Sequence, residues 1–135
     1  MHDDVAVIHE HPRGVVETLD GARVATGMDA IEWVQRGESL GAGEIVVNSI
    51  DRDGTASGYD LDVTRAVADA VNVPVIASGG AGTVDHIADG FTAGGASAAI
   101  ISSILYSPRF VRNVGVSELK DGLRERGVLM RPYLD

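Results

Sequence analysis

The feature that most constrains the fold is an alternation of short apolar runs with longer segments of helical periodicity. Apolar runs without alternating polar residues are typical of strands that are covered on both faces, as in parallel sheets. Because a helical segment follows each run, we expect an α/β fold of four βα units with a parallel sheet. The expected strands are residues 5–8, 44–48, 74–78 and 98–101, with a polar connection between the first strand and Met28.

The helices are expected from capping residues and from apolar residues spaced three or four apart. A first helix is predicted from about Met28 to Gly41 or Gly43. Asp60 and Thr83 are predicted to cap the second and third helices, because their side-chain oxygens can accept hydrogen bonds from the first-turn N–H groups. A last helix is predicted to carry two leucines, four residues apart, on one face and to end at a glycine, in the segment 117–127.

The length indicates what such a fold can be. A complete (β/α)8 barrel takes roughly 250 residues, and this chain has 135. We therefore expect one domain over residues 1–135, either a small open α/β sheet or half of a TIM (β/α)8 barrel. Helices would cover one face of such a sheet, so the other face, with Val46, Ile76 and Ile100 or their neighbours, would need a partner.

Composition excludes several functional classes. The chain has no cysteine, which excludes disulfides, thiolate nucleophiles and zinc–sulfur sites. A net charge of −9 argues against nucleic-acid and anionic-membrane partners. No apolar run approaches the ~20 residues of a membrane span, so a cytoplasmic protein is expected. Lys120 is the only lysine and lies in a helix-like segment, which argues against Schiff-base and P-loop chemistry.

In parallel α/β domains the ligand lies at the carboxyl ends of the strands, so the residues after each strand are the candidates. Asp51 and Asp53 follow the second expected strand and precede Gly54. Either carboxylate could accept hydrogen bonds from substrate hydroxyls or move a proton. The alternative is that these aspartates only stabilise a turn.

The next two strands end in residues suited to an anion. Ser78, Gly79 and Gly80 begin a glycine-rich turn that leads into a helix, and backbone N–H groups of such turns can face an anion. Ser102 and Ser103 follow the fourth strand and offer hydroxyl and N–H groups. Two such turns in tandem favour a phosphate ligand. The alternative is a pair of tight βα turns without a ligand.

Three residues after the first expected strand resemble a metal cluster only superficially. His9, Glu10 and His11 alternate between two faces of an extended strand, so at most the two histidines share a side. We favour a solvated strand end and expect no metal site. Glu10 as a general acid–base remains an open alternative.

The order and spacing of these motifs resemble one enzyme family. Residues 41–60 read GAGEIVVNSIDRDGTASGYD and residues 74–82 read PVIASGGAG. Together with residues 27–30, they resemble the C-terminal half of imidazole glycerol phosphate synthase, cyclase subunit (HisF). The similar region runs from about Thr26 to Ser103. A sister isomerase of histidine biosynthesis, ProFAR isomerase, shares the DGT and SGG elements with different surroundings.

The resemblance implies a (β/α)8-barrel cyclase, a lyase that needs no cofactor. Such an enzyme takes ammonia from a glutaminase subunit and converts a phosphorylated ribonucleotide, PRFAR, to imidazole glycerol phosphate and AICAR. It also implies roles for particular residues: substrate contacts at Asp53 and Gly54, with Asp51 beside them, phosphate binding at Ser78, Gly79, Gly80, Ser102 and Ser103, and an ammonia gate at Glu44. By sequence alone, the favoured explanation of Glu44 is an ordinary solvated carboxylate at the start of a strand.

The chain also departs from the family pattern. Glu10, with His9 as a neighbouring candidate, takes the position of one aspartate of the family's acid–base pair. The other aspartate, on strand one of the full barrel, has no counterpart here. Residues 105–110 replace the usual phenylalanine–histidine phrase and are closer to the isomerase. We therefore expect activity only with a complementary half or in a homodimer. Alternatives are a ProFAR isomerase-like or sugar-biosynthesis enzyme, and a non-catalytic half-barrel that binds phosphorylated ligands.

Overall fold

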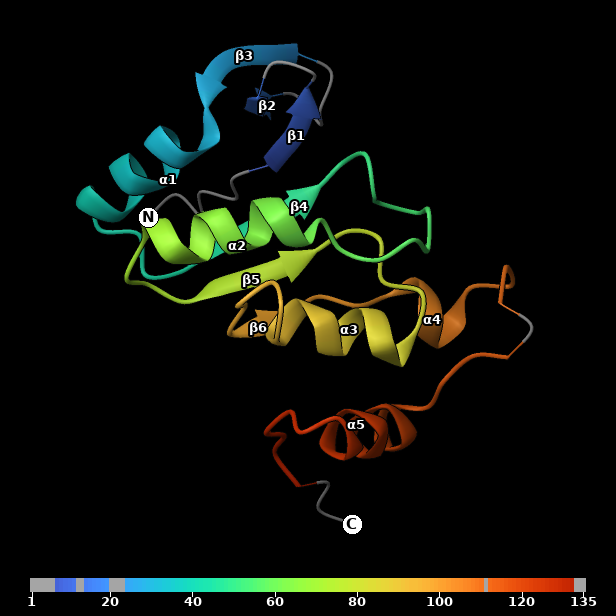
Figure 1. Cartoon of the computed structure of the whole chain (residues 1–135). Helices are drawn as coiled ribbons and strands as arrows, with labels where there is room; N and C mark the ends of the chain where they lie inside the picture. The colour runs from blue at the N-terminus through green and yellow to red at the C-terminus, as the bar shows by residue number, and fades with distance from the viewer. Residues whose placement is uncertain (1–6, 12–13, 20–23, 111, 133–135) are drawn as a thin grey trace.

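A computed structural model describes residues 7–11, 14–19, 24–110 and 112–132, and up to residue 25 it describes only the backbone. The described strands form one sheet in the order β3-β2-β1-β4-β5-β6 (Figure 1). The strands are β1 (Val7–His11), β2 (Gly14–Leu19), β3 (Val24–Asp29), β4 (Ile45–Ser49), β5 (Val75–Ser78) and β6 (Ala98–Ala99). The helices are α1 (Ala30–Ser39), α2 (Leu61–Ala70), α3 (Val84–Phe91), α4 (Ser103–Tyr106) and α5 (Val116–Glu125).

The parallel part of the sheet is the one that the sequence predicts. Strands β1, β4, β5 and β6 run parallel, and each pairs with the next in that order. In this register Val46 lies beside Ile76, and Ile76 lies beside Ala98. The α/β fold of a partial (β/α) barrel is therefore confirmed, although β6 is shorter than expected.

The expectation of a polar connection before α1 was wrong. Strand β2 pairs antiparallel with β1, with Gly14 opposite His11, and β3 pairs antiparallel with β2. Each of these strands combines one adjacent apolar pair, Val15-Val16 or Val24-Ala25, with a single further apolar residue at a distance, which is a weak local signal. Because their hydrogen-bond partners come from the neighbouring strands, the extended backbone is stabilised without a long apolar run. The result is an antiparallel extension at one edge of the sheet (Figure 1).

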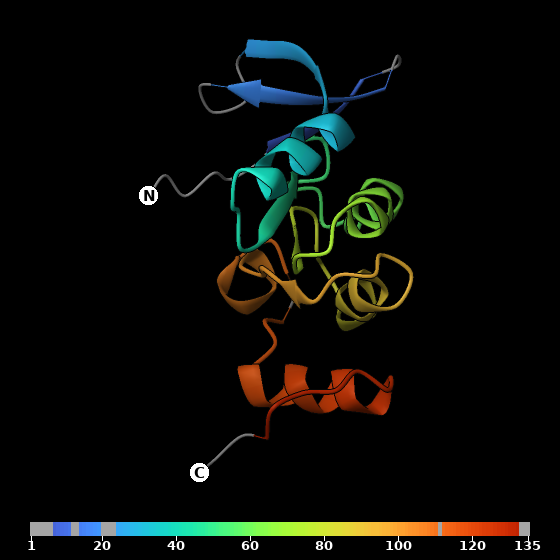
Figure 2. The same ribbon diagram turned by 90° about the vertical axis from the view of Figure 1, so that its left-hand side faces the viewer.

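The first three helices begin at side-chain caps. Asp29, Asp60 and Thr83 each accept a hydrogen bond from backbone N–H groups of the following first turn. The caps at Asp60 and Thr83 are those that the sequence predicts, and the first helix begins two residues after the expected Met28. Helices α2 and α3 lie on the same side of β4 and β5 (Figure 2).

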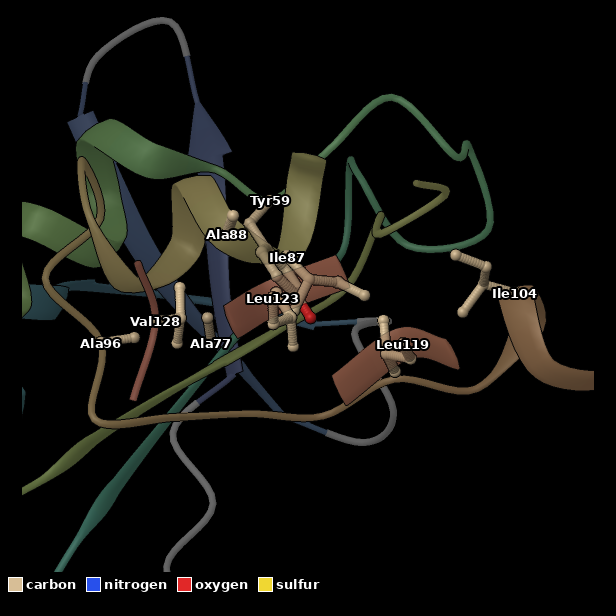
Figure 3. Close-up of a cluster of buried hydrophobic side chains, with 9 residues drawn as sticks. All are labelled: Tyr59, Ala77, Ile87, Ala88, Ala96, Ile104, Leu119, Leu123 and Val128. Carbon is tan, nitrogen blue, oxygen red and sulfur yellow. The ribbon is translucent and has the colours of Figure 1, made fainter. Parts of the chain in front are cut away.

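Two apolar clusters join these helices to the sheet. The first contains residues of α1, β4, α2 and β5, and the second contains residues of β5, α3, α4 and α5 (Figure 3). In the second cluster, the side chains of Tyr59 and Ile87 lie next to Leu123 of α5 (Figure 3). The fully buried members include Val34, Val47, Val67, Ile87 and Ile104.

The C-terminal part of the chain adds one expected and one unexpected helix. Helix α5 buries the two predicted leucines, Leu119 and Leu123, and lies beyond α3, at the opposite end of the molecule from β2 and β3 (Figure 1). The single turn of α4 was not predicted. Among the described residues, none of the helices has the length and apolar character needed to cross a bilayer.

The two faces of the sheet differ in burial. Ile45 and Val47 point into the first apolar cluster and are buried, whereas Val46 between them is only half-buried. Ile76 is likewise half-buried, and Ile100, just beyond β6, is 49% exposed. Within the described part of the chain, this second face carries no covering layer. The expectation of one open apolar face is therefore met.

Candidate functional site

The main pocket of the described structure lies at the carboxyl ends of the parallel strands. It encloses about 620 Å³. Residues 53–56 come from the loop after β4, residues 78–81 from the turn after β5, and residues 100–103 from the segment after β6. Ser107, Arg109 and Phe110 complete the lining. The fold thus brings together the three segments in which the sequence predicts a site.

The loop after β4 is fixed to the turn after β5 by a backbone hydrogen bond. The N–H of Gly58 donates to the carbonyl oxygen of Gly80 over 2.8 Å. In a trans peptide the carbonyl and the following N–H point in opposite directions. Since the described chain has no cis peptide bond, the N–H of Ala81 points away from Gly58. Ala81 lines the pocket.

The next residue, Tyr59, fixes the loop after β4 to the segment after β6. Its hydroxyl donates to the carbonyl oxygen of Ile100 over 2.9 Å. The residue is only 3% exposed, and this burial raises the pKa of the Tyr59 hydroxyl well above its ordinary value. By the same peptide geometry, the N–H of Ile101 points away from Tyr59. Gly58 and Tyr59 therefore hold two carbonyls away from the pocket.

The turn after β5 requires glycine at two successive positions. Gly79 and Gly80 have φ values of +89° and +104°, in the region that favours glycine. A Cβ at Gly79 would lie 2.6 Å from the carbonyl oxygen of Ser49, and one at Gly80 would collide with the carbonyl oxygen of Gly58. The backbone of this turn can therefore pack directly against the loop after β4.

A histidine lies behind this turn. The N–H of Gly82 donates to Nδ1 of His86 over 3.3 Å, and a Cβ at Gly58 would be in ordinary contact with the imidazole ring. His86 lines a second, smaller pocket of about 270 Å³ between the loop after β4 and the starts of α2 and α3. The histidine thus supports the turn from outside the main pocket.

Most of the residues that the sequence predicts for substrate and phosphate binding meet in the main pocket: Asp53, Gly54, Ser78, Gly79, Gly80, Ser102 and Ser103. Asp51 lies in the same loop as Asp53 and is exposed, but it is not among the lining residues. The structure therefore places seven of the predicted residues around one cavity and one beside it.

The other two predicted residues lie elsewhere. Glu44 directly precedes β4 and is exposed, so it lies at the opposite end of that strand from the pocket. Glu10 lies on β1, two residues beyond Ile8, which pairs with Ser49 of β4. The backbone of Glu10 is thus near the carboxyl ends of the strands. Its side chain lies outside the described residues.

The structure adds Arg109 to the predicted lining. Its Nη1 donates to the carbonyl oxygen of Gly54 over 2.9 Å, and its backbone N–H donates to Oγ of Ser107 over 3.3 Å. Arg109 and Gly54 are 55 residues apart in sequence, so no periodic pattern connects them. The only sequence signal was that residues 105–110 depart from the family phrase.

A parallel sheet with helices on one face and a polar pocket at the carboxyl ends of its strands is the architecture of a partial (β/α) barrel. Residues 6–110 match the family described as histidine biosynthesis protein. The chain belongs to this family.

A curated relative shows how much of such a protein the chain spans. The chain is 48% identical over 127 residues to "Imidazole glycerol phosphate synthase subunit HisF" of Solidesulfovibrio magneticus. The similarity covers 94% of this chain and 48% of the relative. The chain therefore spans about half the length of the relative that it matches.

The Tyr59 hydroxyl makes a testable contribution to stability. We expect Tyr59→Phe to lower the free energy of unfolding by about 1–2 kcal/mol, because the Ile100 carbonyl loses a buried donor. Tyr106→Phe is the matched control, since Tyr106 is 69% exposed, and it should change stability by less than about 0.5 kcal/mol. Urea unfolding measures both variants.

The contribution of the Tyr59 hydroxyl to the free energy of unfolding should depend on pH. Because burial raises the pKa of Tyr59 in the folded state, only the unfolded chain ionises this residue just above its ordinary value near 10. Its contribution is therefore complete below pH 10 and declines as the pH rises further. Above pH 10, the difference in the free energy of unfolding between Tyr59→Phe and the unmodified protein should therefore become smaller. If the two proteins were equally stable at neutral pH, the assigned hydrogen bond would be contradicted.

Proposed function

We propose that the chain is the C-terminal half-barrel of an imidazole glycerol phosphate synthase cyclase, the lyase that converts PRFAR and ammonia to imidazole glycerol phosphate and AICAR. The observation that carries the proposal is the convergence of residues 53–54, 78–80 and 102–103 on one pocket. The 48% identity to a HisF subunit favours the cyclase over the sister isomerase. The open face of the sheet favours a chain that works with a complementary half.

The pocket has the backbone chemistry of a phosphate site. Among the described residues, no hydrogen bond is donated by the backbone N–H of Gly79, Gly80, Ser102 or Ser103. The carbonyls of Gly80 and Ile100 are occupied outside the pocket, so the peptides that follow them direct N–H groups the other way. Ala81, which follows the first of these turns, also lines the pocket, and its N–H is one of those directed the other way. These features together support binding of a phosphate group of the substrate.

Carboxylates at the same edge of the sheet are suited to the other parts of the substrate. Asp53 lines the pocket, and its backbone N–H donates to the carbonyl oxygen of Ser49 over 2.9 Å, which fixes the start of the loop. We assign Asp53 to substrate hydroxyls, with Gly54 and Asp51 beside it. Ring closure requires proton transfers, and we assign these to Glu10 at the end of β1.

The opposite end of the sheet is the proposed entrance for ammonia. Glu44 is exposed there, at the start of β4. In a closed barrel, ammonia from a glutaminase subunit would pass this carboxylate and travel along the inner face of the sheet to the pocket. The proposed partners are therefore a glutaminase, the phosphorylated ribonucleotide, and a second half-barrel, either an N-terminal half or another copy of the chain.

Inorganic phosphate tests the anion site directly. Titration of the ¹⁵N-labelled chain should shift the amide resonances of Gly79, Gly80 and Ser103, together with Ala81 and Ile101. Gly80→Ala should abolish the effect, because its Cβ would collide with the Gly58 carbonyl.

Gly43→Ala is the control for this titration, since a Cβ at Gly43 meets nothing within 4 Å. It should bind phosphate as the unmodified chain does. The phosphate site would be refuted if the amide resonances of the unmodified chain did not shift and if calorimetric titration with phosphate gave no heat.

Reconstitution tests the cyclase. The chain, mixed with the N-terminal half of the Solidesulfovibrio magneticus relative, should consume PRFAR with ammonia as the nitrogen source, and neither half should do so as a monomer. Asp53→Asn in the mixed barrel should lower turnover by about 100-fold or more.

Asp62→Asn is the matched control for this assay, because Asp62 is exposed on α2 and does not line the main pocket. It should retain the activity of the unmodified mixture. A well-folded mixed barrel without cyclase activity would contradict the proposal, and turnover by a monomer of the isolated chain would contradict the need for a second half.

A further inference from the structure

The main pocket contains a positive charge that neither the comparisons nor the predicted site assign. Its lining includes two charged side chains among the described residues, Asp53 and Arg109. The remaining lining residues are neutral. The whole chain carries a net charge of −9, so a dianion is repelled by most of the surface and by Asp53. Arg109 is the lining residue that can offset this repulsion.

The position of Arg109 is fixed by contacts at both ends of the residue. Nη1 of its side chain donates to the Gly54 carbonyl, and its backbone N–H donates to Ser107. The first contact joins the segment after α4 to the loop after β4, and both of its residues line the pocket. The guanidinium is therefore held at the pocket by a neutral carbonyl acceptor.

Its charge is also unneutralised within the described residues. Arg65, Arg112, Arg124 and Arg126 each form an ion pair with a carboxylate. In the same part of the chain, Arg109 forms no such pair, and one of its N–H groups is used by Gly54. A guanidinium has five N–H donors in a planar fork that matches the oxygens of a phosphate. Several donors are thus left for a ligand.

We infer that Arg109 binds the dianionic phosphate ester of the substrate and selects it over neutral and singly charged groups. The inference deepens the proposed function and rests on it, because it assigns a residue to the same anion site. Backbone N–H groups orient the phosphate oxygens, and Arg109 supplies the positive charge. Through Gly54, it also holds the loop that carries Asp53, so phosphate binding and the position of that carboxylate are linked.

Phosphate-binding measurements on three variants of the whole chain test this role. Arg109→Gln keeps an N–H donor on a shorter side chain but removes the charge, and it should weaken binding of inorganic phosphate by about ten- to a hundredfold. Arg109→Lys restores the charge without the fork and should recover most of the affinity. Arg112→Gln removes a nearby exposed arginine that does not line the pocket, so it should bind as the unmodified chain does.

Salt dependence separates a charge contact from a merely structural role. Affinity should fall less steeply with added salt in Arg109→Gln than in the unmodified chain, because one charge contact is missing. Thermal unfolding of Arg109→Gln should match that of the unmodified chain, as expected for an exposed residue.

The outcomes distinguish this inference from the function on which it rests. If the unmodified chain binds phosphate and Arg109→Gln binds it equally well, the role of Arg109 is wrong and the anion site stands. If Arg109→Gln and Arg109→Lys are equally weak, the side chain acts through its shape, and the charge role is again wrong. If the unmodified chain binds no phosphate, both the site and the inference are overturned.

Discussion

The site depends on the capture of two backbone carbonyls by two adjacent residues. Gly58 donates its N–H to the Gly80 carbonyl, and Tyr59 donates its hydroxyl to the Ile100 carbonyl. These two contacts connect the loop after β4 to the ends of both following strands. Carbonyl dipoles that faced the pocket would repel an anion. Because these two carbonyls are directed away from it, the local field favours an anion. The polarity of the pocket thus arises from backbone geometry, with Arg109 as its one cationic side chain among the described residues.

This arrangement is possible because the surrounding residues are small where the backbone segments cross and apolar where they pack. Gly80 admits the Gly58 carbonyl at a point where a Cβ would collide with it. Tyr59 fills the second apolar cluster with its ring, and a Cβ at Gly90 of α3 would lie 2.8 Å from that ring. The same residue therefore contributes to the core and orients the site. On the other face of the sheet the half-buried Val46 and Ile76 remain without a covering layer among the described residues, which agrees with the proposal of a second half-barrel.

The sequence predicted the elements whose signal is local. The β4 and β5 strands are compact apolar runs, and Asp60 and Thr83 cap helices because their own side chains reach the first-turn N–H groups. Strands β2 and β3 were missed because their stability comes from pairing with each other and with β1. The single turn of α4 is too short to show a period.

In the candidate site, too, the residues with a local signal were predictable and those that depend on distant contacts were not. Its glycines and serines were predictable, because they directly follow parallel strands and such strands end at a common edge. The contact between Arg109 and Gly54 was not, since it joins positions 55 residues apart. The role of Tyr59 was also missed, because only the packing of β6 beside β5 brings the Ile100 carbonyl within reach of its hydroxyl.

Hydrogen exchange at Gly58 tests the central claim most directly. Its N–H should exchange as slowly as the amides of the β4–β5 ladder, because its acceptor is the buried Gly80 carbonyl. The neighbouring N–H of Ser57, which donates to the exposed Thr55 hydroxyl over 3.2 Å, should exchange much faster. Exchange of Gly58 at the rate of Ser57 would show that the loop is not held to the turn, and it would contradict the account of how the pocket is formed.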